Sequence, residues 1–172
     1  NTGSMHGLLK KGNKVWLSKS NNPKRKLKYT LEIIEIYGSK VGVNTHSTNK
    51  IVFDALQNNL LKEIKKNSEI IPEVKFGANT RFDFLIKNKN FKAFLEVKNV
   101  TLSRKLKLAE FPDAVTTRGL KHIKELTKAG NKGYEVFIVF VVQREDCNKF
   151  KIASDIDPQY AELLNKAVKK NL

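Results

Sequence analysis

Residues 81–98 read RFDFLIKNKNFKAFLEVK, in which two runs of alternating apolar and polar residues flank a polar segment. Such alternation predicts two antiparallel strands joined by a tight turn. A loop with an even number of residues, such as one that pairs Lys87 with Lys92, sets Asp83 directly opposite Glu96 on the same face. An odd loop would place the two carboxylates on opposite faces.

The two faces of this hairpin differ in chemistry. Alternation places Lys98 beside Glu96 on one face, and an apolar set on the other: Phe82, Phe84, Leu95 and Val97. Facing carboxylates repel each other unless a cation lies between them, and carboxylate oxygens are what Mg²⁺ or Mn²⁺ prefers. Lys98 could then orient a water molecule and stabilise charge on a phosphate. The simpler alternative is that Lys98 only neutralises Glu96.

Hydrophobic periodicity places the remaining elements around this hairpin. An N-terminal β-region is followed by the order helix, three strands, helix, strand, helix, which is an α/β arrangement. We expect Asn49 to cap the first helix, and we expect strand 134–142 to be central and buried on both faces. Pro112 should lie in the first turn of the second helix, and Asp157 should open the last. The predicted strands are 14–20, 29–37, 40–44, 72–76, 81–86, 91–97 and 134–142, and the predicted helices cover 51–61, 112–129 and 158–170.

Charge favours a polyanionic partner. The 172 residues carry 33 Lys+Arg against 17 Asp+Glu, a net charge of +16. Residues 1–31 hold eight basic residues and no acidic one, a segregation that codon bias towards lysine would not produce. Nucleic acid is therefore the expected partner, because its backbone binds Lys and Arg through phosphates. An anionic membrane is the weaker alternative, since no basic amphipathic helix is predicted.

Two features bear on the compartment. The longest apolar run, residues 136–142, is far shorter than a membrane span, so we expect no membrane segment. The single cysteine, Cys147, excludes an internal disulfide framework and a Cys-rich zinc site. We therefore expect a cytoplasmic protein with a free thiol.

Several segments resemble a known family. The chain resembles the PD-(D/E)XK nuclease superfamily in its element order and in the pattern formed by Asp83, Glu96 and Lys98. More specifically, the sugar fermentation stimulation protein A family is similar in segments that run almost from end to end: NTGSM (1–5), NNPKRKL (21–27), VGVNT (41–45), RFDFL (81–85), EVK (96–98), FPDAVT (111–116), RGLKH (118–122) and FVVQR (140–144).

The resemblance implies a fold and two domains. It implies a partial OB-like β-domain over residues 1–44, followed by a PD-(D/E)XK nuclease-like domain, a mixed sheet flanked by helices, over residues 45–172. Relatives of this family carry further strands before the NTGSM segment and after the last helix, so the barrel is expected to be incomplete here. The resemblance also implies a DNA-binding protein.

The resemblance assigns roles within the site. Asp83 and Glu96 match the metal-binding acids, Lys98 matches the catalytic lysine, and the carbonyl of Val97 would be a further metal ligand. Asp54, on the first core helix, is the candidate to complete the metal shell, with a solvated helix carboxylate as the alternative.

Other polar residues are candidates for contact with the substrate. Gln143 ends the buried strand, where it could contact the substrate or a metal-bound water. Arg118, Lys121 and His122 fall within about one helical turn and could clamp phosphates, or belong to an ordinary solvated basic face. The loop that holds Lys24, Arg25 and Lys26 is expected to track the phosphate backbone. Asp113 is instead interpreted as a first-turn helix carboxylate.

These features together predict a DNA-binding protein that cleaves phosphodiester bonds with Mg²⁺ or Mn²⁺. The alternative is a DNA-binding regulator, linked to sugar metabolism, that keeps a nuclease-like fold without turnover. RNA is a further alternative to DNA, because charge and fold do not distinguish the two.

Overall fold

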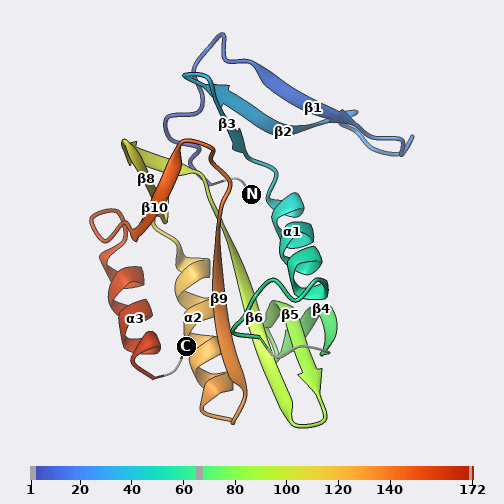
Figure 1. Cartoon of the computed structure of the whole chain (residues 1–172), viewed down its shortest axis with the longest axis vertical. Helices are drawn as coiled ribbons and strands as arrows, with labels where there is room; N and C mark the ends of the chain where they lie inside the picture. The colour runs from blue at the N-terminus through green and yellow to red at the C-terminus, as the bar shows by residue number, and fades with distance from the viewer. Residues whose placement is uncertain (1–2, 65–67, 171) are drawn as a thin grey trace.

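The N-terminal region is a small antiparallel sheet. The computed structural model of the chain describes residues 3–64, 68–170 and 172. Strands β1 (Val15–Lys19), β2 (Tyr29–Ile36) and β3 (Ser39–Gly42) pair in the order β1-β2-β3 at the top of Figure 1. Ile34, Ile36 and Val41 from β2 and β3 are buried with Met5 and Leu8 in one cluster.

A mixed sheet forms the centre of the rest of the chain. Strands β4 (Glu69–Phe76), β5 (Thr80–Asn88), β6 (Phe91–Val100) and β9 (Glu135–Val142) pair in the order β4-β5-β6-β9. The β6–β9 pair is parallel and the others are antiparallel. Figure 1 shows helices α1 (Thr45–Gln57) and α2 (Thr117–Gly130) on either side of this sheet, with α3 (Pro158–Val168) outside α2. This is the α/β class that the sequence predicts.

A further small sheet was not predicted. Strands β7 (Leu102–Lys105), β8 (Lys107–Phe111) and β10 (Cys147–Ile152) pair in the order β10-β8-β7. Their sequences are short and rich in lysine, so they show no clear apolar alternation. The β10–β8 pair is also parallel and far apart in sequence, which local patterns do not reveal.

Several predicted details are wrong. Asn44, not Asn49, caps α1, since its side chain accepts the backbone N–H of His46. Helix α2 begins at Thr117 behind the cap Thr116, so Pro112 precedes it by five residues. Strand β9 lies at the edge of its sheet, as far as the chain is described, and β6 is an inner, buried strand.

Within the described residues, no helix is long and apolar enough to cross a membrane.

The β5–β6 hairpin has the predicted register, with Lys87 paired to Lys92. One prediction about its faces is wrong, because Phe82 and Phe84 lie on opposite sides of the sheet. Phe84 belongs to the hydrophobic cluster that includes Val52 and Leu56 of α1. Phe82 belongs to the cluster that includes Leu126 and Ala129 of α2. The alternation breaks at Asp83, which lies between them and is absent from the ladders to β4 and β6.

The N-terminal sheet is attached to the larger domain through backbone hydrogen bonds. Gly42 N–H donates to the carbonyl of Gln143 at 2.9 Å, and Glu145 N–H donates to the carbonyl of Lys40 at 3.2 Å. Val41 and Arg144 form an isolated antiparallel bridge between these bonds. Strand β3 is therefore held along the residues that follow β9.

Asp113 makes a second attachment and is not a first-turn helix carboxylate as predicted. Its side chain accepts the backbone N–H of Ser4 at 2.7 Å and that of Met5 at 3.2 Å. The hydroxyl of Ser4 donates to the same carboxylate at 3.1 Å. Gly3 approaches this carboxylate so closely that a Cβ on it would lie 2.4 Å from Asp113 Oδ2. Asp113 thus holds the N-terminal segment next to α2.

Candidate nuclease-like site

Glu96 is the centre of the candidate site. It lies on β6 with 3% of its surface exposed. Its Oε1 accepts a hydrogen bond from Lys98 Nζ at 2.6 Å and forms another with His122 Nδ1 from α2. Its Oε2 is buried and has no hydrogen-bond partner within the described part of the chain. One oxygen is therefore bonded to both Lys98 and His122, and the other is left without a partner among the described residues.

The pKa of Glu96 reflects these contacts. Burial acts to raise it, but the hydrogen bond from His122 and the charge of Lys98 outweigh burial and leave the pKa below its ordinary value. Lys98 reaches Glu96 because residues two apart on a strand point to the same face. Glu96 is thus held as a buried carboxylate anion.

Asp83 lies beside Glu96 and is held by two donors. Its Oδ2 accepts the backbone N–H of Val97 at 2.7 Å, and its Oδ1 accepts Asn49 Nδ2 at 2.9 Å. Burial, and then the charge of Glu96, raise the pKa of Asp83, and the bonds from Val97 and Asn49 offset part of this effect. The two carboxylates are therefore close enough to disfavour each other's charge, as the hairpin register suggested.

Gln143 joins the end of β9 to two other elements. Its Nε2 donates to Thr48 Oγ1 on α1 at 2.8 Å and to Asn99 Oδ1 on β6 at 2.7 Å. Asn99 directly follows Lys98. Consecutive strand residues point to opposite faces, so Gln143 and Asn99 meet on the α1 side of the sheet, whereas Glu96 meets His122 of α2.

Asp54 does not belong to the site, contrary to expectation. It is exposed, whereas Thr48, Val52 and Leu56 form the buried stripe of α1. Asp54 is two residues from Val52, which on an α-helix is a rotation of about 200°. The side chain of Asp54 thus points away from the sheet, and it is Asn49 from the same helix that reaches Asp83.

The predicted phosphate-binding residues all lie on the surface. Arg118 is exposed in the first turn of α2, and Lys121 is exposed with its Nζ bonded to the carbonyl of Asn79 at 2.6 Å. Residues 24–26 are exposed in the loop between β1 and β2. This loop lies at the end of the hairpin remote from the large sheet (Figure 1).

Two functional positions were missed from the sequence. Asn49 was expected to be a helix cap, and His122 was expected to share a basic surface with Arg118 and Lys121. A usable signal for His122 exists, because His122, Leu126 and Ala129 recur at helical spacing and all three are buried. The contact with Glu96 itself depends on how α2 packs.

The acids fit a metal ion in part. Among the described residues, no three His, Cys, Asp or Glu side chains form a ready cluster of ligands. The unpartnered Oε2 of Glu96 and the adjacent Asp83 are nevertheless oxygen donors of the kind that divalent ions bind. A cation at this position would offset the repulsion from Glu96, which adds to burial in raising the pKa of Asp83. The pair therefore fits an ion that completes its coordination with water or substrate oxygens.

Comparison with known proteins supports the resemblance. Residues 46–172 match the model described as the sugar fermentation stimulation protein RE domain, and residues 1–43 match the N-terminal OB domain of the same family. Among relatives, a sugar fermentation stimulation protein homolog from Pelagibacter ubique is 59% identical over 162 residues, which is 94% of this chain and 70% of that protein. A homolog from Bartonella quintana is 43% identical over 173 residues, covering 100% of this chain and 74% of that protein.

A solved structure has the same fold. The structure of Pyrococcus furiosus SfsA in complex with Ca²⁺ superposes with a TM-score of 0.90 at 29% identity. The match covers 99% of this chain and 72% of the other. Together with the family models, it confirms the predicted fold class, an OB domain followed by mixed sheets flanked by helices.

Proposed function

Since this chain belongs to the sugar fermentation stimulation protein family, whose name specifies no chemistry, we propose from its site that it binds DNA and cleaves phosphodiester bonds with Mg²⁺ or Mn²⁺. The observation that carries the proposal is the buried Oε2 of Glu96, which lacks a partner among the described residues beside Asp83 and Lys98. Unsatisfied buried polar atoms are uncommon in proteins and mark places where an ion or water binds.

Asp83 and Glu96 are the residues that would hold the cation. The carbonyl of Val97 is a further candidate, because the bond from its N–H keeps the Asp83 carboxylate next to this part of β6. When bound, a divalent ion polarises the phosphate and lowers the pKa of a water molecule. The related archaeal protein was solved in complex with Ca²⁺, a cation that takes oxygen ligands as Mg²⁺ does.

Lys98 supplies positive charge at the reacting centre. Its side chain is 11% exposed, so its ammonium group acts in an environment of lower dielectric constant than water. There it can orient the attacking water and offset negative charge that develops on the phosphate. His122 does not contact the substrate in this proposal but holds Glu96 from the side of α2.

The basic surface would bring the nucleic acid to this site. The net charge of +16 and the exposed residues 24–26 favour phosphate contacts at the OB domain. Arg118 and Lys121 offer further positive charge at the start of α2, the helix that carries His122. RNA is an alternative partner. We place this function in the cytoplasm, where the thiol of Cys147 would stay reduced.

A non-catalytic regulator is the second candidate. It is favoured by one observation, that Lys98 forms an ion pair with Glu96 and His122 bonds to the same oxygen without a metal ion. A protein that binds DNA through its basic surface needs nothing more from this cluster than stability.

One experiment separates the two candidates. Single-stranded, duplex and branched DNA would be incubated with the protein and Mg²⁺ or Mn²⁺. Cleavage that is lost in Asp83→Asn and in Lys98→Ala, but retained in the matched control Asp54→Asn, is the result that we expect. If the wild-type protein binds these DNAs and cleaves none of them, the nuclease proposal is wrong and the non-catalytic regulator is supported.

A further inference from the structure

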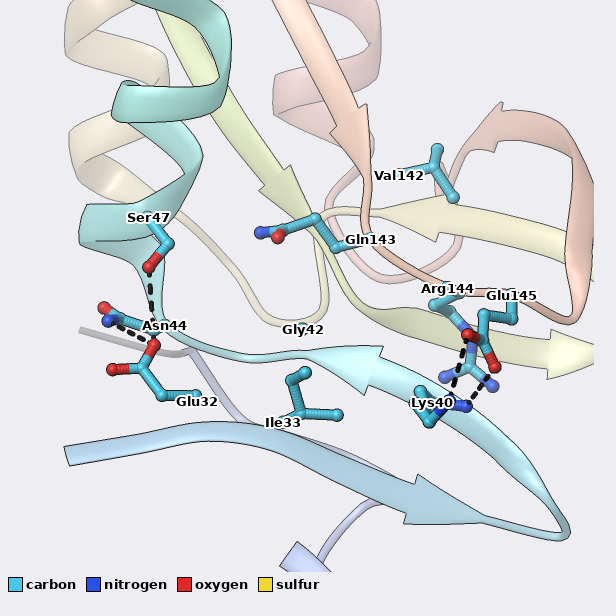
Figure 2. Close-up of a pocket in the computed structure, with 10 residues that line it drawn as sticks. All are labelled: Glu32, Ile33, Lys40, Gly42, Asn44, Ser47, Val142, Gln143, Arg144 and Glu145. Carbon is cyan, nitrogen blue, oxygen red and sulfur yellow. Dashed lines mark hydrogen bonds and ion pairs between the residues drawn. The ribbon is translucent and has the colours of Figure 1, made fainter. Parts of the chain in front are cut away.

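A cavity lies between the OB domain and the nuclease-like domain. Its volume is about 470 Å³. Strands β2 and β3 form one side, and the start of α1 and the residues after β9 form the other (Figure 2). Pockets of this size commonly hold one small molecule or one group of a larger ligand. The side chains that decide its chemistry are Glu32, Lys40, Asn44, Gln143, Arg144 and Glu145.

The cavity shares a wall with the candidate site. Gln143 lines it and also donates through Nε2 to Asn99 on β6 and to Thr48 on α1, the helix that supplies Asn49 to Asp83. The Oε1 of Gln143 points towards Gly42, because a Cβ built there would lie 2.7 Å from this oxygen. A group bound in the cavity would therefore be next to Gln143.

The charges around the cavity favour a neutral ligand group. Glu32 and Glu145 balance Lys40 and Arg144. Both cations also have anionic partners, since Lys40 Nζ lies 3.8 Å from Glu145 Oε1 and Arg144 Nη2 lies 2.7 Å from Asp146 Oδ2. On a chain with a net charge of +16, this balanced lining is a poor place for a phosphate.

Hydrogen-bond acceptors dominate at the end nearest α1. The Glu32 carboxylate accepts from Ser18 at 2.5 Å and from Asn44 at 2.8 Å. These bonds hold the pKa of Glu32 below its ordinary value, so it remains ionised and can only accept. The Nε2 of Gln143 is already engaged, so Oε1 is the atom that this side chain can offer. A matching ligand must donate hydrogen bonds.

Apolar contacts are available beside these acceptors. Ile33 from β2 and Val142 from β9 both line the cavity, and Gly42, the cross-strand partner of Ile33, adds no side chain there. A planar group can pack on such aliphatic side chains while its edge meets the acceptors. Neutral charge, a flat apolar face and a donor edge are the properties of an amino-bearing nucleobase.

We propose that this cavity receives one unpaired nucleobase of a bound strand and prefers bases with an exocyclic amino group, such as cytosine, over thymine. The inference rests on the proposed binding of nucleic acid. It adds that the strand is bound by a base as well as by its phosphates. Thymine presents a carbonyl where cytosine presents an amino group. A carbonyl and the Glu32 carboxylate are both hydrogen-bond acceptors, so thymine would leave the carboxylate without a donor from the ligand.

The test compares two labelled 15-nucleotide single strands, all-dC and all-dT, by fluorescence anisotropy at pH 7.5 with EDTA present. For the wild-type chain we expect dC to bind at least about fivefold more tightly than dT, the effect of roughly one hydrogen bond. Glu32→Gln removes the charge of the acceptor, and Ile33→Phe reduces the space. Each should bring the two affinities within about twofold, and thermal melting would verify that both variants fold. Lys24→Ser, in the loop remote from the cavity, should weaken both strands and preserve their ratio.

The outcomes separate this inference from the function on which it rests. Equal affinity for the two strands in the wild type, or a dC preference that survives in both folded cavity variants, would overturn the nucleobase site while nucleic-acid binding stands. Absence of binding to either strand at low salt would instead remove the proposed function itself.

Discussion

Replacing Lys98 with methionine is expected to destabilise the protein by about 3 kcal/mol, because it leaves the buried carboxylate of Glu96 with less compensation. Methionine keeps most of the length of the side chain and removes only its charge. The ammonium group lies 2.6 Å from Glu96 Oε1, and the two side chains are 11% and 4% exposed. Such a pair is a structural element whether or not the site is catalytic.

The magnitude follows from this geometry. Two unit charges 2.6 Å apart attract by about 6 kcal/mol at an effective dielectric constant of 20. Desolvation of both groups cancels part of this attraction, and truncation of one partner of a buried pair usually costs about 3–5 kcal/mol. We expect the lower end for Lys98→Met, because His122 continues to bond to Glu96.

The assay is a double-mutant cycle measured by urea unfolding. Lys98→Met, Glu96→Gln and the double variant would be compared with the wild type at pH 7. We expect the double variant to be about as stable as Glu96→Gln alone, which gives a coupling energy of roughly 2–3 kcal/mol. Lys98→Arg should recover part of the lost stability. A coupling energy below about 0.5 kcal/mol would refute the reasoning, because that is the size expected for an exposed pair.

Three other predictions concern the rest of the fold. Gly3→Ala should cost about 2 kcal/mol and expose the N-terminal segment to proteolysis, because φ at Gly3 is +72° and the new Cβ would clash with Asp113. Glu110→Gln should cost about 1–2 kcal/mol at pH 7, since the bond from Arg104 is charge-assisted. Because that bond lowers the pKa of Glu110 from 4.5, its stabilisation is present above pH 4.5 and is lost as the pH falls through the lowered value, so urea unfolding of variant and wild type should converge in acid. Replacing residues 24–26 with serine should reduce the slope of log affinity against log salt by roughly one for each phosphate that the variant no longer neutralises. The melting temperature should change little. An unchanged slope would mean that DNA does not contact this loop.

Local sequence patterns were sufficient to predict the register of the hairpin that carries the two acids. The polar turn and the alternation on each side define a register in which Lys87 meets Lys92, and the structure has this register. The sequence also predicted the start of α3, because Asp157 directly precedes Pro158. In the structure Asp157 caps this helix, and its side chain accepts the backbone N–H of Tyr160. Both features depend on residues that are close together in the chain.

Errors arose where a local pattern had competing solutions. Asn44 and Asn49 both look like helix caps, and the fold uses Asn44 as the cap and Asn49 as a partner of Asp83. Strand β9 is the most apolar segment, yet it lies at the edge of its sheet as described. Its apolar side chains pack against α1 on one face and against α2 and α3 on the other, and this packing, rather than a strand on each side, accounts for its composition.

The sequence by itself determined the fold class, the basic character and the three residues Asp83, Glu96 and Lys98 of the candidate site. The fold class follows from the order of helix and strand patterns along the chain, the basic character from composition, and the three residues from the register of one hairpin and the motif that they resemble. Only the tertiary structure decided that His122 holds Glu96, that Asp54 faces solvent, and that a cavity forms beside Gln143. The physical reason is that alternation specifies which face a side chain takes, whereas contacts between distant elements depend on how α1, α2 and the N-terminal sheet pack on that face.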